Sequence, residues 1–409
     1  MLVWLILVVH NDIKIKGIKM NIAKSPCETI YKNGENVLTY LPVSITEQQQ
    51  PTQNDIFNSW VNGRFDVYEE LGDRVGLRKP QVGALYSVLG YIICDDKSPS
   101  TVVMPTGTGK TETILSIVVA GKFNRTLVIV PSDALRQQTS DKFIKLGLLR
   151  NLNLIDDKIL NPKVLSIKQG VKSDEDFKQI EEANVIVATV DSLTFYNDLE
   201  LSKLGAMCSH LIIDEAHHVA ARTWNRVKEL FSEKYVFQFT ATPFRTDGKR
   251  VDGKVLYNYP ISDAQKDGYF KEIEFHPVKE FVDEFADKKI ADLAISLLQK
   301  DIDDGLDHIL MARAGTIKKA TEIFKIYQEY KKFSPVLINS NSKNKKQLLS
   351  DIKAGKHKII VCVDMLGEGF DLPQLKISAL HDLHKSINVM LQFTGRFTRQ
   401  DKSLGNAKF

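Results

Sequence analysis

The residues best suited to chemistry lie in a glycine-rich stretch, Thr106-Gly-Thr-Gly-Lys-Thr111. An apolar, β-branched run precedes this stretch and a helix-forming run follows it, which is the strand–turn–helix order of a phosphate-binding loop. Gly107 and Gly109 would let backbone N–H groups curl around phosphate oxygens at the positive end of the helix. Lys110 would reach the β- and γ-phosphates, and the Thr111 hydroxyl would bind Mg²⁺.

One position departs from the strict phosphate-loop pattern. Met104 stands where that pattern has the glycine that precedes Gly109 by five residues. Taken alone, the stretch therefore leaves an alternative open, namely an ordinary strand–helix turn rich in Gly and Thr.

Two adjacent carboxylates form a second chemical group. Asp214 and Glu215 directly follow the apolar run Leu211-Ile-Ile213, and two acids at the end of a buried strand are costly unless a cation or a task awaits them. With a phosphate loop upstream, Asp214 would hold Mg²⁺ through water, and Glu215 would orient and deprotonate the attacking water. His217 would connect the nucleotide site to its neighbours, whereas His218 is interpreted as structural or solvated.

Polar side chains on two further elements extend the candidate site. Gln81 lies in the first turn of a helix predicted over 77–92, and its carboxamide offers the donor and acceptor that adenine N6 and N7 require. The alternative for Gln81 is a solvated surface residue. Thr240 and Thr242 end another apolar run and would relay a shift by hydrogen bonding, unless they only satisfy backbone groups there.

The C-terminal part of the chain contains a possible arginine pair. Gln392, Arg396 and Arg399 recur at helical spacing, so both guanidinium groups could meet negative charge on a transferring phosphate. Surface salt bridges are the alternative. A sharp glycine-containing turn is predicted at 364–373, and the lysines within 343–358 are interpreted as a solvated face, with contact to a nucleic-acid backbone as the alternative.

The elements that would position these residues alternate along the chain. Strands are predicted at 101–104, 126–130, 164–167, 185–189, 211–213 and 236–243, and in a second unit at 308–312, 335–338 and 358–363. Helices are predicted at 56–60, 67–71, 77–92, 112–120 and 261–270, and in the second unit at 290–298 and 317–330. This alternation predicts parallel α/β sheets, which bind ligands at the carboxyl ends of their strands.

Composition sets wider bounds. With 409 residues, 43% of them hydrophobic and 26% charged, the chain can form two globular domains. The net charge of +4 permits a nucleic-acid partner without requiring one. The four cysteines share no metal-ligand spacing, which favours a reduced, cytoplasmic compartment. The apolar run 1–9 is too short to span a membrane, and it favours a buried strand or a start at Met20 over a membrane anchor.

Taken in order, these segments resemble the motifs of superfamily 2 helicases. Residues 104–111 resemble motif I, 130–138 motif Ia, 214–217 the DEAH form of motif II, 240–242 motif III, 363–373 motif V and 392–399 motif VI. Arg78-Lys-Pro-Gln81 and 239–249 further resemble the helicase (Res) subunits of type I and type III restriction enzymes and related phage-defence or repair helicases.

The resemblance implies an α/β fold of two RecA-like lobes with parallel sheets and ATP in the cleft between them. The expected domains are a short N-terminal extension (1–74), lobe 1 or helicase ATP-binding domain (75–275), and lobe 2 or helicase C-terminal domain (276–409). Because the chain stops ten residues after Arg399, lobe 2 is expected to be truncated.

The resemblance also implies a role for each motif residue. Catalysis would fall to Lys110, Glu215, Gln392, Arg396 and Arg399. ATP would be bound by Gln81, Thr106, Gly107, Thr108, Gly109, Lys110, Thr111, Gly369 and Asp371. Thr111 and Asp214 would hold Mg²⁺, and His217, Thr240 and Thr242 would couple the site to its surroundings.

The expected function is that of an ATP-dependent helicase or translocase that couples ATP hydrolysis to movement on nucleic acid. The resemblance favours double- or single-stranded DNA as the partner, together with nuclease or modification subunits, and no membrane. A different class of function stays open. In that class the chain is a nucleic-acid-sensing ATP switch, or a regulatory subunit of a restriction or defence complex with little turnover.

Overall fold

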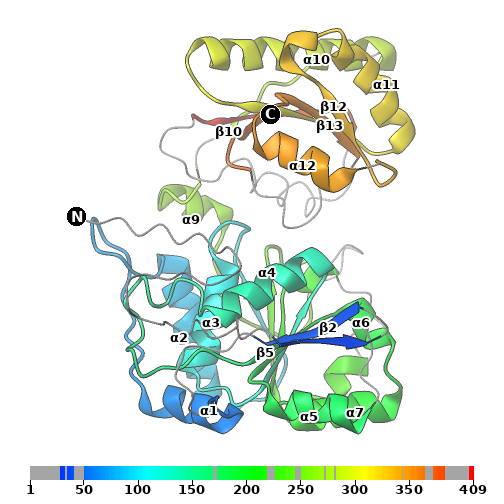
Figure 1. The fold of residues 1–409 in the computed structure, drawn as a ribbon. Coiled ribbons are helices and arrows are strands. Elements are labelled where there is room, and N and C mark those ends of the chain that lie inside the picture. The colour runs from blue at the N-terminus through cyan, green and yellow to red at the C-terminus, as the bar shows by residue number, and fades with distance from the viewer. Residues whose placement is uncertain are drawn as a thin grey trace, which may run out of the picture.

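The computed structural model describes residues 28–32, 35–40, 50–168, 173–218, 226–244, 250–270, 273–280, 282–342, 344–363, 372–382 and 405–409. Their strands form a seven-stranded sheet, a six-stranded sheet and a two-stranded ribbon. Figure 1 shows the two larger sheets as separate bodies, each covered by its own helices. The two-lobed α/β architecture expected from the sequence is therefore confirmed.

The seven-stranded sheet has the order β5-β6-β4-β7-β8-β3-β9, and every neighbouring pair is parallel. Its strands are β3 (Ser100–Val103), β4 (Thr126–Val130), β5 (Val164–Ile167), β6 (Val185–Thr189), β7 (His210–Ile213), β8 (Tyr235–Thr240) and β9 (Lys254–Asn258). Strands β7, β8 and β3 are consecutive in this order, so the segments that follow them meet at one edge of the sheet.

Helices cover both faces of this sheet. They are α1 (Gln53–Asn62), α2 (Lys79–Ile93), α3 (Lys110–Ala120), α4 (Asp133–Ile144), α5 (Asp174–Glu182), α6 (Val190–Thr194) and α7 (Asp198–Met207). The 3₁₀ turn η1 (Ala216–His218) follows β7, and α9 (Ile261–Lys266) packs with Tyr259 and Phe270 in a separate cluster. Along β4, Val128 and Val130 join the core that contains α1 to α4, whereas Leu127 and Ile129 join the core beneath α5 and α7. Burial on both faces explains why this strand is apolar at every position after Thr126.

The six-stranded sheet is built in the same way. Its order is β10-β15-β14-β11-β13-β12, and its neighbouring strands are parallel. The strands are β10 (Ile273–Glu274), β11 (Ile309–Ala314), β12 (Val336–Ile338), β13 (Ile359–Val363), β14 (Leu375–Leu380) and β15 (Ala407–Lys408). Its helices are α10 (Asp283–Asp303), α11 (Ile317–Gln328), the 3₁₀ turn η2 (Lys331–Phe333) and α12 (Lys345–Lys353).

Near the N-terminus, β1 (Glu28–Lys32) pairs with β2 (Glu35–Tyr40) in an antiparallel ribbon, and β2 lies against β5 (Figure 1). The apolar run 1–9 lies outside the described residues. Within the described ranges, no helix is long and apolar enough to cross a membrane.

Two helix predictions need correction. The segment 67–71 is not helical: Glu69 forms a bridge with Leu77, and Leu71 forms one with Arg74. The reason is a tight turn at Gly72, whose φ of 59° lies in the left-handed region. The helix predicted over 261–270 ends at Lys266, because Gly268 adopts a φ of 77° and breaks the helical path.

Candidate nucleotide site

The glycine-rich loop connects β3 to α3 as the sequence predicted. Gly107 and Gly109 have φ values of 94° and 95°, a region that favours glycine, and Gly109 is the N-cap of α3. A Cβ on Gly109 would come within 2.4 Å of the Gln81 side-chain nitrogen. Both glycines are therefore required by the shape of the loop.

The position that departs from the strict pattern continues the sheet. The Met104 N–H donates to the Thr240 carbonyl at 2.9 Å, and the fully buried Met104 side chain belongs to the core that α3 covers. Because Met104 lies beneath the loop, its side chain leaves the phosphate side of the loop unchanged.

An ion pair joins the two sequence motifs with the strongest case for chemistry. Lys110 Nζ lies 3.0 Å from Glu215 Oε1, and Lys110 is only 7% exposed. The same ammonium donates to the Met104 carbonyl at 3.4 Å. Glu215 therefore compensates a buried positive charge at the place where the sequence predicts a phosphate.

Asp214 and Glu215 follow β7 directly and lie beside this loop. Glu215 adopts a φ of 51°, a left-handed conformation that costs a non-glycine residue about 1 kcal/mol. Its N–H donates to Asp214 Oδ1 at 2.9 Å, and Asp214 is 5% exposed. Strained backbone of this kind gathers at functional sites.

A hydrogen-bond chain connects these acids to β8. The Thr240 hydroxyl donates to the Thr242 carbonyl at 2.7 Å, so its oxygen is left to accept from His217 Nδ1 at 3.0 Å. His217 Nδ1 also lies 3.5 Å from Glu215 Oε2, and His217 is 1% exposed. The three residues predicted to couple the site are thus in one connected group. His218 lies in η1.

Gln81 is buried, which excludes a solvated surface residue. It is 5% exposed, its side-chain nitrogen donates to the Gly109 carbonyl at 3.1 Å, and its side-chain oxygen accepts from the Arg78 N–H at 2.8 Å. An amide nitrogen carries two protons and an amide oxygen two lone pairs. The side chain therefore retains one further N–H donor and one further acceptor lone pair, which are the groups that adenine N6 and N7 require.

Sequence reasoning missed Arg78, although this residue contacts the loop directly. Its Nη1 donates to the Gly107 carbonyl at 2.7 Å. The available signal was its position at the start of α2, three residues before Gln81 and within the Arg78–Gln81 signature.

The chemistry of the described donors fits a nucleotide with Mg²⁺. In the loop, the Thr108 hydroxyl donates to the Pro105 carbonyl at 2.7 Å, whereas the buried Thr106 hydroxyl has no protein partner. Among the described residues, no group of three or more His, Cys, Asp or Glu side chains could hold a metal. Mg²⁺ at a nucleotide site binds through one or two protein ligands, phosphate oxygens and water. Thr111 and Asp214 are the candidates.

The remaining predicted residues lie outside the described ranges. They are Gly369, Asp371, Gln392, Arg396 and Arg399. Their proposed contribution from lobe 2 stays a prediction.

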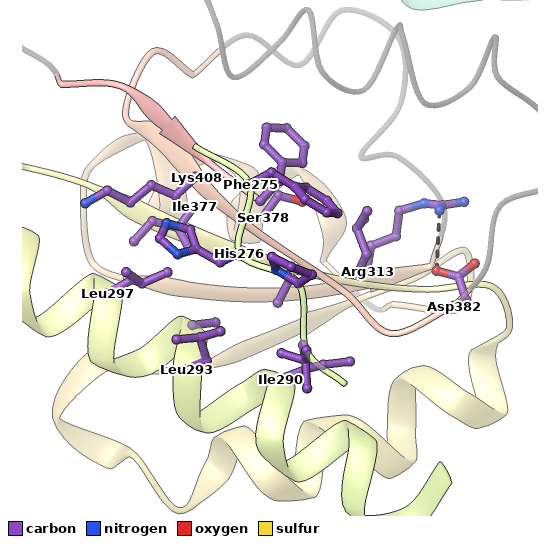
Figure 2. A pocket seen from close by; sticks show the side chains of 16 residues that line it. Phe275, His276, Ile290, Leu293, Leu297, Arg313, Ile377, Ser378, Asp382 and Lys408 are labelled. Atoms are coloured by element: carbon purple, nitrogen blue, oxygen red, sulfur yellow. Dashed lines mark hydrogen bonds and ion pairs between the residues drawn. The ribbon is translucent and has the colours of Figure 1, made fainter. Parts of the chain in front are cut away.

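The second lobe has an apolar cavity of about 410 Å³ between α10, β14 and the segment 275–278 (Figure 2). Leu293 and Leu297 of α10 line it, and the Arg313–Asp382 ion pair, at 3.4 Å, lies at one end. The described residues that line it include no candidate of the nucleotide site. This cavity is therefore distinct from the phosphate loop.

Two parallel sheets with a phosphate loop at a carboxyl edge define the RecA-like class of P-loop proteins. Comparison with family models then places the chain more narrowly. Residues 74–245 match the type III restriction enzyme, res subunit, and residues 297–401 match the helicase conserved C-terminal domain. The chain belongs to the superfamily 2 helicases, the nucleic-acid helicases that hydrolyse ATP.

Similar proteins include both DNA and RNA enzymes. The chain is 24% identical to the DNA 3'-5' translocase XPB2 of Sulfurisphaera tokodaii, over 80% of each chain. It is 26% identical to the putative ATP-dependent helicase IRC3 of Saccharomyces cerevisiae, over 54% of this chain and 36% of that protein. Apart from the translocase, the chain spans about half or less of the curated relatives it matches.

Solved structures show the same fold. The type ISP restriction-modification enzyme LlaBIII bound to DNA matches with a TM-score of 0.52 and 17% identity, over 83% of this chain and 27% of that one. The DEAD-box helicase Mss116 bound to single-stranded RNA matches with a TM-score of 0.56 and 15% identity, over 82% of this chain and 70% of that one.

Proposed function

We propose that this chain is an ATP-driven translocase that couples ATP hydrolysis to movement on DNA. The observation that carries the proposal is the ion pair between Lys110 and Glu215, which joins the phosphate loop to the acidic motif at one sheet edge. In this arrangement the lysine is ready for a phosphate, and the carboxylate that holds it is the candidate base.

The ion pair suggests how ATP would activate the site. The γ-phosphate takes over Lys110, and Glu215 is thereby released to accept a proton from the attacking water. As the water oxygen bonds to the γ-phosphorus, the bond to the leaving ADP oxygen breaks. Thr111 and Asp214 would hold Mg²⁺, which would supply positive charge against the phosphates. Lys110 thus changes partner at the moment when the base is needed.

The same exchange would reach the nucleic acid through His217. Glu215 Oε2 lies 3.5 Å from His217 Nδ1 in the structure. When the Glu215 carboxylate leaves Lys110, this second oxygen moves as well. His217 is bonded to Thr240 at the end of β8, so the change passes to motif III. This short chain supports the predicted coupling role of His217, Thr240 and Thr242.

DNA is proposed over RNA from the relatives. The DNA translocase XPB2 matches 80% of its own length, and the res-subunit model covers the whole phosphate-loop region. The RNA helicase DBP3 of Candida albicans is matched over 49% of its length.

Displacement of the third strand from a DNA triplex tests the proposed movement. A translocase should displace the third strand in the presence of ATP without separating the underlying duplex, and the Glu215→Gln variant should not. Release of single strands from the duplex would instead assign strand separation. ATP binding that causes neither event would contradict a motor and favour the nucleic-acid-sensing switch.

A further inference from the structure

The guanidinium of Arg78 lies between two parts of the molecule that are far apart in sequence. On one side, its Nη1 donates to the Gly107 carbonyl at 2.7 Å. On the other side, its Cζ lies 5.6 Å from the centroid of the Tyr269 ring, within the range of a cation–π contact. One side chain thus touches both the phosphate loop and the segment that follows α9.

The contact with Gly107 affects how the loop can present its N–H groups. The C=O and the following N–H of a peptide unit point in opposite directions. Arg78, the N-cap of α2, donates to the Gly107 carbonyl, and Gln81 in the first turn of α2 donates to the Gly109 carbonyl, which also accepts from the Thr113 N–H of α3. The N–H that follows the Gly107 carbonyl, that of Thr108, donates to the Pro105 carbonyl at 3.3 Å, so this peptide unit is fixed on both sides. A loop whose peptide units are fixed in advance loses less conformational freedom when a phosphate binds.

Tyr269 is itself fixed to the start of α2. Its hydroxyl accepts from the Lys79 N–H at 3.0 Å, and Lys79 Nζ pairs with Asp267 at 2.8 Å. Burial raises the pKa of Tyr269 to about 12, so the hydroxyl stays neutral at physiological pH. The Tyr259 hydroxyl also donates to Asp267, at 2.6 Å. These contacts hold the Tyr269 ring against the guanidinium.

The segment that carries Tyr269 leads into the second lobe. Tyr269 precedes β10 (Ile273–Glu274) by four residues, and β10 pairs with β15 in the six-stranded sheet. Arg78 is therefore in contact both with the phosphate loop and with the segment that leads into the second lobe.

We propose that Arg78 is a positioning residue that holds the phosphate loop ready for ATP and that is itself positioned by Tyr269. The inference builds on the proposed ATP site and adds a residue and a partner to it. Because the contact acts before ATP arrives, its loss should weaken ATP binding more than it slows the chemical step.

Measurements of ATP affinity and of KM and kcat test this role in the full chain. Arg78→Met keeps much of the side-chain length but removes the charge and the donors. We expect it to raise both the Kd for a fluorescent ATP analogue and the KM about tenfold, as for loss of one charged hydrogen bond. We expect kcat at saturating ATP and DNA to change less than KM. Arg78→Lys, which retains a charge and a donor, should recover part of the affinity.

Tyr269 supplies the second arm of the test. Tyr269→Leu should raise KM in the same direction, and Tyr269→Phe, which keeps the ring, should do so less. If the ring acts through Arg78, the double variant Arg78→Met/Tyr269→Leu should be no worse than Arg78→Met alone. Additive effects would overturn the positioning of Arg78 by Tyr269.

Arg74 provides a matched control. Its Cζ lies 5.4 Å from the Tyr68 ring centroid, a similar cation–π contact on the exposed surface of the same region. Arg74→Met should leave Kd and KM unchanged. If wild type binds ATP but Arg78→Met and Arg78→Lys both stay within twofold of it, the inference fails and the proposed function survives. If wild type does not bind ATP, the proposed function fails first.

Discussion

At the scale of single residues, the site is held in a resting state by charge compensation. Lys110 and Glu215 are both shielded from solvent, and each would be costly to leave alone. A phosphate is a natural substitute for the glutamate because it also offers anionic oxygens to the ammonium. Exchange of one partner for the other is the smallest event that the proposed cycle requires.

Removal of the candidate base should separate binding from hydrolysis. In Glu215→Gln the side chain keeps its size but cannot accept the proton of the attacking water. We expect ATP still to bind while kcat falls by about 10²-fold or more. Single-turnover hydrolysis alongside analogue binding would check this, and turnover near the wild-type rate would rule out Glu215 as the base.

Removal of the loop lysine should act on binding itself. Lys110→Ala deletes the cation expected at the β- and γ-phosphates and leaves Glu215 without it, so both ATP affinity and turnover should be lost. Lys142→Ala is a suitable control. Lys142 lies on α4, and its Nζ is also 3.0 Å from a glutamate, Glu112 on α3. Tight ATP binding by Lys110→Ala in equilibrium titration would contradict the predicted site.

The hydroxyl of Thr240 should matter for coupling. Thr240→Val keeps the shape of the side chain but removes the acceptor of His217 Nδ1 and the donor to Thr242. We expect stimulation of the ATPase by nucleic acid to fall about tenfold, which is a typical size for coupling between two sites. The KM for ATP should change little. The control is Thr101→Val, which removes a buried hydroxyl bonded to the Asp252 carbonyl at 3.0 Å. Equal stimulation in both variants would count against a coupling role.

At the scale of elements, sequence patterns predicted strands best where both faces are buried. The bounds of β4, β5 and β6 agree residue for residue with the prediction, because apolar residues dominate these strands and each strand has a single polar residue, Thr126, Ser166 or Thr189. Strand β14 was missed, since Lys376 and Ser378 interrupt its apolar run although both are buried in the structure. Short segments such as 67–71 depend on a single turn, whose geometry the apolar spacing does not record.

Part of the candidate site could be predicted from the sequence, and part of it could not. Spacing within a motif predicted which residues follow a strand, and the order of the sheet then brings the ends of β3, β7 and β8 together. The role of Arg78 could not be predicted from spacing, because it depends on the direction of a carbonyl at Gly107 and on a ring about 190 residues away, as α2 packs against the segment of Tyr269.

The start of β7 should make lobe 1 sensitive to acid. The His210 ring stacks on Phe123 with centroids 3.5 Å apart, and burial, with Lys234 nearby, lowers the pKa of His210 to about 3. Between pH 6.5 and 3 the unfolded histidine is protonated while the folded one is not, so stability falls as the pH falls through this window.

Replacement of this histidine should remove that part of the acid sensitivity. In His210→Phe, the loss of unfolding free energy from pH 7 to pH 4.5 should be smaller than in wild type by about 2 kcal/mol. Urea unfolding at the two pH values would measure the difference. An equal pH dependence in the two proteins would show that folding does not lower the pKa of His210.

At the scale of the whole molecule, two parallel sheets provide two bodies whose relative movement ATP could control. Lobe 1 alone supplies the described phosphate loop, Asp214 and Glu215. The proposed lobe 2 contribution of Gln392, Arg396 and Arg399 would complete the grip on the γ-phosphate. ATP would then favour the closed arrangement because both lobes contact it, and hydrolysis would release them.

The rate of ATP hydrolysis by the purified chain, alone and with double-stranded DNA, single-stranded DNA or RNA, tests the central claim most directly. We predict that DNA raises the rate at least about tenfold, that RNA raises it much less, and that Glu215→Gln abolishes the increase. A rate that no nucleic acid changes, despite measurable ATP binding, would contradict a nucleic-acid motor. Stimulation by RNA alone would contradict the choice of DNA.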